Sequence, residues 1–305
     1  MRRQVGALAY IGSPAGGILV HSFDVSVREA RIIQNELRCR VELTDRIESP
    51  DEIELVGGAD VAFLPRFPAS SEDSAAFPIQ YMTHCRGTLQ CAPAFEEGSG
   101  RDPQRVHCIH RGAIVPDSLG DGRDAGIVAL AVVTVIDVKR CAVVETAFAA
   151  VHVRFPYIPG FLTFREGPAV LAALGELKTL PGVMIYDGAG IAHPRGLGIA
   201  SHMALLTGIP SIGCAKSLLT GVCDEPGGEK GEWTYIYLNG RASGTCLRTR
   251  NGVKPVYVSP GSGFSVDGAR KFVLLLTGSY RLPEPTRIAH IMVTRKKQEL
   301  IRKPL

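Results

Sequence analysis

The chain has 305 residues, of which 45% are hydrophobic, and it carries a formal net charge of +4. This length and composition are typical of a soluble globular protein of one or two domains. No apolar run approaches the roughly 18 residues of a membrane span, so we expect no membrane partner. The slight positive charge permits a polyanionic partner without requiring one. The eight scattered cysteines favour buried thiols in a reducing cytoplasm over a disulfide framework, so we expect a cytoplasmic location.

The first clear element follows a loosely specified N-terminal extension, residues 1–22. Ser26 and Glu29 form a capping box, and the apolar residues after them recur at helical spacing. We therefore predict an amphipathic helix over residues 26–41, with its arginines on a solvated outer face.

Two acids compete for a place in the predicted sheet. Residues 52–64 predict a strand with Asp60 in its apolar middle, and a lone buried carboxylate is costly unless it is paired, hydrogen-bonded or bound to a metal. Asp60 is therefore either a functional group or a residue at a solvent-facing edge, and spacing alone leaves both open. Runs over 127–137 and 141–153 predict a strand pair with a tight turn. Asp137 closes the first run, where the adjacent Lys-Arg turn favours solvent exposure.

An insert, residues 68–126, separates these strands. Pro, Gly and Ser are dense there and the apolar residues show no sustained period, which predicts an irregular or disordered segment. Its histidines and cysteines lack the tight pairs typical of zinc sites, so structural zinc is the weaker interpretation. They are His84, Cys85, Cys91, His107, Cys108 and His110.

The stretch from residue 155 to residue 216 carries polar residues at the joints between apolar elements and Gly/Pro-rich turns. Loops held by rigid elements often carry binding and catalytic groups, so this stretch is the strongest candidate for a functional site. The residues are Tyr157, Glu166, Asp187, His193 and Lys216.

Each of these residues also has a plain structural interpretation. Gly167-Pro168 opens an apolar helix pattern, so Glu166 lies at the predicted helix N-terminus and could be only a helix-capping acid. Residues 183–186 predict a short buried strand that ends at Asp187. Tyr157 could equally be a core aromatic residue.

The remainder of the chain predicts further strands, one helix and a basic end. His202 lies within a helical pattern over 197–206 and is more simply a packed histidine than a ligand. From Arg287 onward six basic residues face one acidic residue, which is typical of a solvated end that can also contact a nucleic-acid backbone. The predicted elements are strands near 233–238, 245–249 and 253–258, hairpin turns at Asn239-Gly240 and Asn251-Gly252, and a helix near 266–276.

Seven collinear motifs closely resemble the endonuclease V family of deoxyinosine-directed repair nucleases. Any one motif alone would be weak, but together they span about 24–67 and 127–295. They are Gly58-Ala59-Asp60-Val61, Pro156-Tyr157-Ile158-Pro159-Gly160, Phe164-Arg165-Glu166-Gly167-Pro168, Asp187-Gly188-Ala189-Gly190-Ile191-Ala192-His193-Pro194, Ile199-Ala200-Ser201-His202, Ala215-Lys216-Ser217 and Arg281-Leu282-Pro283-Glu284-Pro285-Thr286-Arg287.

The resemblance implies an RNase H-like α/β fold, with a mixed five-stranded sheet flanked by helices. The nuclease domain would cover 23–300, interrupted by the insert and followed by a basic tail, 301–305. Asp60 would lie on the central strand, in preference to Asp137. Asp187 would end the neighbouring strand, and Glu166 would project from the start of the first crossover helix.

The resemblance also implies a metal-dependent reaction. Asp60, Glu166 and Asp187 would form a hard, oxygen-rich site of the kind Mg²⁺ prefers, with Mn²⁺ as a substitute. His290 matches a position that assists at the metal. Lys216 and His193 would add positive charge or proton transfer near the scissile phosphate.

The implied product is a nick at the second phosphodiester bond 3′ to deoxyinosine, with 3′-hydroxyl and 5′-phosphate ends. A wedge would fill the gap left by the extruded base, and glycine-lined backbone would read that base. The wedge residues are Pro156, Tyr157, Ile158, Pro159 and Gly160, and the reading glycines are Gly160, Gly188 and Gly190.

Two residues depart from the family pattern. Ala189 stands where the family commonly has histidine, and Ser262 follows Ser259-Pro260-Gly261, where a histidine is frequent. Neither removes a candidate metal ligand.

Two other functions stay open, namely a catalytically weak binder of inosine-containing nucleic acid and an RNase H-like nuclease that cuts inosine RNA or mismatched or branched DNA. The family analogy favours a monomer.

Overall fold

The computed structural model describes residues 21–47, 52–64 and 126–302. The N-terminal extension and nearly all of the predicted insert, with its scattered histidines and cysteines, lie outside the described residues. Within these three ranges no helix is long and apolar enough to cross a membrane.

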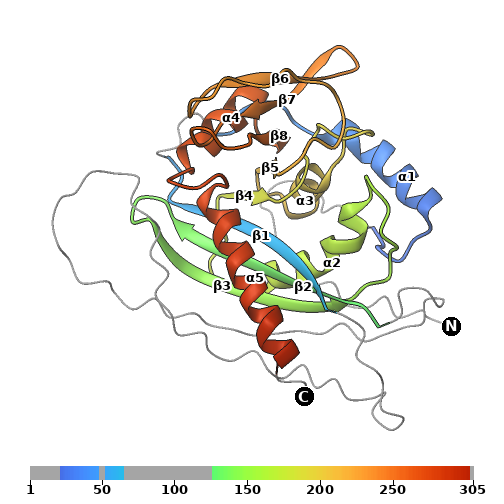
Figure 1. Ribbon diagram of the computed structural model, residues 1–305. Coiled ribbons are helices and arrows are strands. Elements are labelled where there is room, and N and C mark those ends of the chain that lie inside the picture. The colour runs from blue at the N-terminus through green and yellow to red at the C-terminus, as the bar shows by residue number, and fades with distance from the viewer. Residues whose placement is uncertain (1–20, 48–51, 65–125, 303–305) are drawn as a thin grey trace, which may run out of the picture.

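One mixed sheet of eight strands runs through the described chain in the order β3-β2-β1-β4-β5-β8-β7-β6 (Figure 1). β4 pairs in parallel with β1 and β5, and the other pairs are antiparallel. The expected mixed sheet is present, but it continues through β8, β7 and β6 beyond the five strands expected. The strands are β1 (Leu55–Leu64), β2 (Val128–Asp137), β3 (Ala142–His152), β4 (Val183–Tyr186), β5 (Ser211–Ala215), β6 (Trp233–Leu238), β7 (Arg241–Leu247) and β8 (Val256–Ser262).

Helices cover both faces of the sheet. Alternate residues of β2 point to opposite faces, so Ala131 packs with α2 and α3 whereas Val132 packs with α5. Figure 1 shows α5 crossing the face of β1 and β2. The helices are α1 (Val27–Leu37), followed by a 3₁₀ turn (Arg38–Arg40), α2 (Leu162–Gly175), α3 (Ile199–Thr207), α4 (Val266–Leu275) and α5 (Glu284–Arg302).

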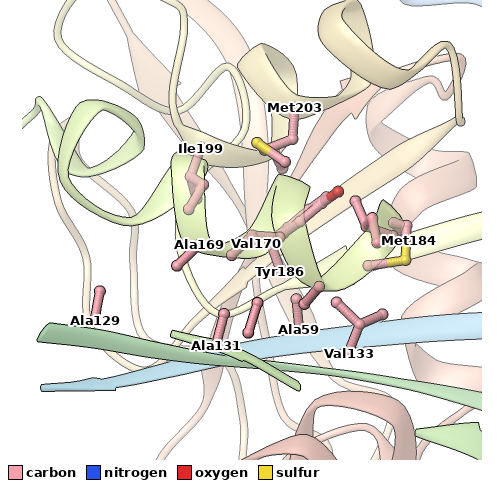
Figure 2. Packing of buried hydrophobic residues seen from close by; sticks show 14 of the residues in the cluster. Ala59, Ala129, Ala131, Val133, Ala169, Val170, Met184, Tyr186, Ile199 and Met203 are labelled. Atoms are coloured by element: carbon pink, nitrogen blue, oxygen red, sulfur yellow. The ribbon is translucent and has the colours of Figure 1, made fainter. Parts of the chain in front are cut away.

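Small side chains on the central strands let α2 and α3 lie close to the sheet. Ala59, Ala129 and Ala131 point toward Val170 and Met203, and this cluster is almost fully buried (Figure 2). The cluster holds the strand that carries Asp60 against the helix that carries Glu166.

A glycine on β1 fixes the position of α5. A methyl group at Gly58 would lie 2.1 Å from the carbonyl carbon of Pro285, so only glycine allows this approach. Thr134 on β2 also donates a hydrogen bond to the carbonyl of Pro285 (3.1 Å). Together these contacts place the first turns of α5, and therefore His290, over the middle of β1.

Two local predictions differ from the structure. The helix predicted to open at Gly167-Pro168 begins earlier, at Leu162, so Pro168 lies inside α2 and Glu166 follows its first turn. Asp137 is buried rather than exposed, because its carboxylate accepts a hydrogen bond from the backbone N–H of Arg140 (2.9 Å) and so closes the turn after β2.

Candidate active site

Three carboxylates converge from three different elements. Asp60 lies on β1, Glu166 on α2, and Asp187 directly after β4. The parallel pairing of β1 with β4 ends at Ala59 and Tyr186, so Asp60 and Asp187 are the next residues on two neighbouring strands. Each of these two aspartates raises the pKa of Glu166, which places all three charges within electrostatic reach of one another.

The surroundings of Glu166 strongly disfavour its ionised form. Burial, and then the negative charges of Asp60 and Asp187, raise its pKa from 4.5 to about 8. Arg165 opposes this shift. A carboxylate in such surroundings needs either a proton or a nearby cation at neutral pH.

Asp60 is held by α5. The Nδ1 of His290 donates to its Oδ2 (2.7 Å), and the backbone N–H of Val61 donates to its Oδ1 (2.9 Å). Burial nevertheless raises the pKa of Asp60, and the charge of Asp187 adds to that effect. His290 therefore lies beside Asp60, and its role at a metal, which the family resemblance implies, stays a prediction.

Asp187 forms an ion pair with Lys216, which directly follows β5. The Nζ of Lys216 lies 2.5 Å from the Oδ2 of Asp187, and the side chains are 39% and 25% exposed, respectively. Arg281 donates to the carbonyls of Lys216 and Pro255 (both 2.7 Å), which fixes the backbone of this lysine. The lysine thus presents its charge at an accessible edge of the carboxylate site.

The donor set suits a hard divalent cation, although no cluster of three potential ligands is already gathered around one point in the described ranges. Asp60 is instead bound to His290, and Asp187 to Lys216. Three mutually repelling carboxylates supply oxygen ligands of the kind that Mg²⁺ and Mn²⁺ accept.

A short loop directly before α2 presents an exposed tyrosine. Tyr157 is 70% exposed, while Phe155 and Phe161 at the two ends of the loop are buried. Pro156 and Pro159 are also exposed, and Ile158 is partly buried. We call residues 156–160 the wedge loop. An exposed aromatic residue on a loop with two stiffening prolines excludes the interpretation of Tyr157 as a core residue.

Comparisons with known proteins identify the family of this chain. The family model described as Endonuclease V matches residues 117–291. An endonuclease V of Gloeobacter violaceus is 35% identical over 278 residues, covering 91% of this chain and 89% of its own. One from Kosmotoga olearia is 49% identical over 175 residues, 57% of this chain and 77% of its own. The chain belongs to the endonuclease V family.

Solved endonuclease V structures share the fold. That of Streptomyces avermitilis has a TM-score of 0.66 at 34% identity and covers 90% of this chain and 95% of its own. That of Bacillus subtilis has a TM-score of 0.70 at 25% identity and covers 92% and 97%, respectively. The predicted RNase H-like fold is therefore confirmed, and family membership makes the protein a nuclease.

The surroundings of His193 disfavour a positive charge, which was one of the two roles expected of it, whereas its role in proton transfer stays a prediction. It is only 2% exposed, its Nε2 donates to the carbonyl of Gly160 (2.9 Å), and its Nδ1 accepts from the backbone N–H of Arg195 (3.2 Å). Burial lowers its pKa to about 4. The neutral ring is fixed in one tautomer and supports the wedge loop, so it supplies no positive charge at neutral pH.

Gly190 is also unsuited to its expected contact with an extruded base. Its N–H donates to the Oγ of Ser259 (2.7 Å), and a methyl group on it would lie 2.0 Å from the carbonyl oxygen of Pro260. Gly190 instead allows the loop after β4 to pack on β8. Gly188 is partly exposed beside Asp187, and its role stays a prediction.

Three other sequence observations are explained by packing. His202 is buried, with its Nε2 2.6 Å from the Nε2 of His21, as expected for a packed histidine. Ala189 is buried, and its carbonyl accepts from the N–H of Ala200 (3.1 Å). Ser262 is buried and accepts from the N–H of Glu42 (3.1 Å).

Sequence reasoning missed Gln34, Arg195 and Arg281 as residues that support the site. Arg195 directly follows the family motif that ends at Pro194, which was an available signal. Gln34 lies in the apolar stripe of α1, where a polar residue is out of pattern. Arg281 opens the family motif over 281–287, but its contact with Lys216 could not be foreseen, because that contact depends on the position of the loop before α5.

Proposed function

We propose that this endonuclease V is a metal-dependent DNA repair nuclease that cuts the second phosphodiester bond 3′ to deoxyinosine. The products carry 3′-hydroxyl and 5′-phosphate ends. The observation that carries the proposal is the meeting of Asp60, Glu166 and Asp187 beside Lys216, in a chain of this family. The partner is DNA that contains deoxyinosine, and the protein acts as a monomer.

The carboxylates hold the metal in this proposal. Asp60, Glu166 and Asp187 are the ligands, and His290 assists through Asp60. There, Mg²⁺, or Mn²⁺ in its place, would supply stabilisation of the charge that develops on the phosphate oxygens and a lowered pKa for the attacking water. The raised pKa of Glu166 supports this assignment, because a bound cation favours the ionised carboxylate that burial and its neighbours disfavour.

Lys216 acts on the phosphate that is cut. Hydrolysis adds a water oxygen to phosphorus and breaks the bond from phosphorus to the 3′-oxygen, which leaves as a hydroxyl after protonation. The partly exposed ammonium beside Asp187 stabilises the negative charge of that transition state. Its pairing with Asp187 keeps it in place before the substrate binds.

The wedge loop selects the lesion. Extruding a base costs a few kcal/mol, and the cost is smallest for weakly paired bases such as hypoxanthine. The exposed ring of Tyr157 fills the gap, and its proline-rich loop limits the conformational entropy lost on binding. A Ciona intestinalis endonuclease V, 22% identical, has been crystallised with DNA containing an inosine followed by a ribo-adenosine. Inosine RNA is a second candidate substrate for this chain.

A nicking assay with end mapping tests the proposal. The substrates are matched duplexes with deoxyinosine, a mismatch or a branch, and an RNA with one inosine, each with Mg²⁺, Mn²⁺ or EDTA. The proposal predicts one metal-dependent cut at the second bond 3′ to deoxyinosine. Binding without cutting would support the weak-binder alternative. Preference for the mismatch, the branch or the inosine RNA would support the other nuclease function.

A further inference from the structure

A buried glutamine on α1 contacts the wedge loop. Gln34 is 1% exposed and lies on the same face of α1 as the buried residues Ala30 and Leu37. A buried amide is costly unless its polar atoms are hydrogen-bonded. All of the polar atoms of this side chain are satisfied, and their partners lie in the two loops that carry the wedge and His193.

The contacts of Gln34 converge on one carbonyl. Its Nε2 donates to the carbonyls of Gly160 (3.0 Å) and Leu197 (3.2 Å), and its Oε1 accepts from the Nε of Arg195 (2.5 Å). The carbonyl of Gly160 also accepts from the Nη2 of Arg195 (2.5 Å) and the Nε2 of His193 (2.9 Å). Three side chains from two separate segments therefore hold the last residue of the wedge loop.

The backbone of Gly160 is shaped for this clamp. Its φ of +82° lies in the region that favours glycine, and a methyl group there would lie 2.8 Å from the Nη2 of Arg195. The guanidinium of Arg195 also stacks on the ring of Phe161, 4.0 Å from its centroid. Position 160 thus fixes the direction in which the chain leaves the wedge loop.

Resting on the proposed function, we propose that Gln34 is a positioning residue for lesion recognition. It ties α1 to Gly160 and Arg195 and so holds the wedge loop with Tyr157 directed outward. Gln34 itself does not contact the reacting atoms in this proposal. Its effect should therefore fall on the extrusion of a paired base rather than on bond cleavage.

Gln34→Met tests this inference, because methionine keeps the length of the side chain and removes its hydrogen bonds. The substrates are two duplexes, one with deoxyinosine opposite cytosine and one with deoxyinosine opposite an abasic site, where little pairing must be broken. We expect kcat/KM to fall roughly tenfold more for the paired than for the unpaired substrate, which corresponds to about 1.4 kcal/mol. The kcat on the unpaired substrate should stay within about twofold of the parent value.

A double-mutant cycle separates positioning from loss of stability. Tyr157→Ala should lower the same paired-to-unpaired ratio, and adding Gln34→Met should lower it little further, because Gln34 acts through the wedge. Leu37→Ala weakens the same face of α1 without touching Gly160 and should leave the ratio unchanged. Asn35→Ala on the exposed face is the matched surface control.

The outcomes are distinct. An unchanged ratio in Gln34→Met, or an effect that adds fully to that of Tyr157→Ala, overturns the inference while the proposed function stands. If Gln34→Met is unfolded at the assay temperature, Gln34→Glu replaces it, since it keeps the acceptor for Arg195 and loses the donor to Gly160. A parent protein that cuts neither duplex overturns the proposed function and this inference together.

Discussion

Glu166 links protonation to metal binding at one residue. Its pKa of about 8 means that the metal-free protein holds a proton there at neutral pH, whereas the unfolded chain, with a pKa near 4.5, does not. Because the folded state binds the extra proton between these values, the free energy of unfolding contributed by Glu166 falls as the pH rises from 4.5 to 8. A bound cation should remove this penalty by favouring the ionised form.

Glu166→Gln therefore changes the pH dependence of stability. In EDTA, we expect the free energy of unfolding of the parent to decline more steeply between pH 5 and 8 than that of Glu166→Gln. Denaturant unfolding at several pH values measures both slopes, and added Mg²⁺ should reduce the difference between them. Parallel slopes in EDTA would show that the environment of Glu166 does not oppose its charge.

Lys216→Met should impair cleavage more than binding. Removing a preorganised charge from the transition state typically costs roughly 100- to 1,000-fold in kcat, so we expect a loss of this size for deoxyinosine DNA. The Kd for that DNA, measured in Ca²⁺, should rise only a few-fold. Lys254→Met removes an equal charge from an exposed loop and should leave kcat unchanged. A matching loss in both variants would mean that only the net charge matters.

The acids were predictable at this scale, and the residues that orient them were not. Asp60 and Asp187 became candidates because a carboxylate in or after a buried strand is out of pattern, and the family motifs then favoured Asp60 over Asp137. The burial of His193 and Gly190 could not, since their partners, Gly160 and Ser259, lie on other elements. A motif gives the residue types, whereas tertiary contacts decide which of them face the substrate.

At the scale of elements, the position of α5 depends on Gly58 of β1, which has no side chain. Gly58→Ala would place a methyl group 2.1 Å from the carbonyl carbon of Pro285 and push α5 away from the strand. We expect a loss of about 1–3 kcal/mol in the free energy of unfolding, as is typical of overpacking. The displacement should also separate His290 from Asp60 and raise the Mg²⁺ concentration needed for activity.

Gly175→Ala is the matched control, because its methyl group would meet no atom within 4 Å at the end of α2. It should be neutral or stabilising by roughly 0.5–1 kcal/mol. Thermal unfolding and a Mg²⁺ titration of both variants make the comparison. Equal stability of the two variants would contradict the role given to Gly58.

Local sequence patterns predict most helices and strands, but they do not predict the residues at which these elements begin and end. The β-branched runs of β2 and β3 and the Asn239-Gly240 turn, with φ of 52° and 74°, match the predicted strand pairs. The start of α2 was placed too late, because proline usually occupies a first helical turn and here lies within the helix. The central sheet extends through β8, β7 and β6 because β5 pairs with β8. No local sequence pattern encodes that pairing.

For the molecule as a whole, the topology creates the site. β1, β4 and β5 run in parallel, so the residues toward their carboxyl-terminal ends lie on the same side of the sheet. Asp60 and Asp187 follow the last β1–β4 pair and Lys216 directly follows β5, while α2 adds Glu166 and α5 adds His290. The family motifs predicted this meeting, whereas composition and spacing alone left Asp60 and Asp137 as alternatives.

The most direct test of the account is the nicking of an end-labelled deoxyinosine duplex by the parent, Asp60→Ala and Asp137→Ala, each with Mg²⁺ or EDTA. Both aspartates belong to the same strand pair, but Asp137 only closes a turn. We predict Mg²⁺-dependent cutting by the parent and by correctly folded Asp137→Ala, and a loss of at least roughly 100-fold in Asp60→Ala, since a lost metal ligand costs several kcal/mol. Undiminished cutting by Asp60→Ala, or cutting by the parent in EDTA, would contradict the carboxylate metal site.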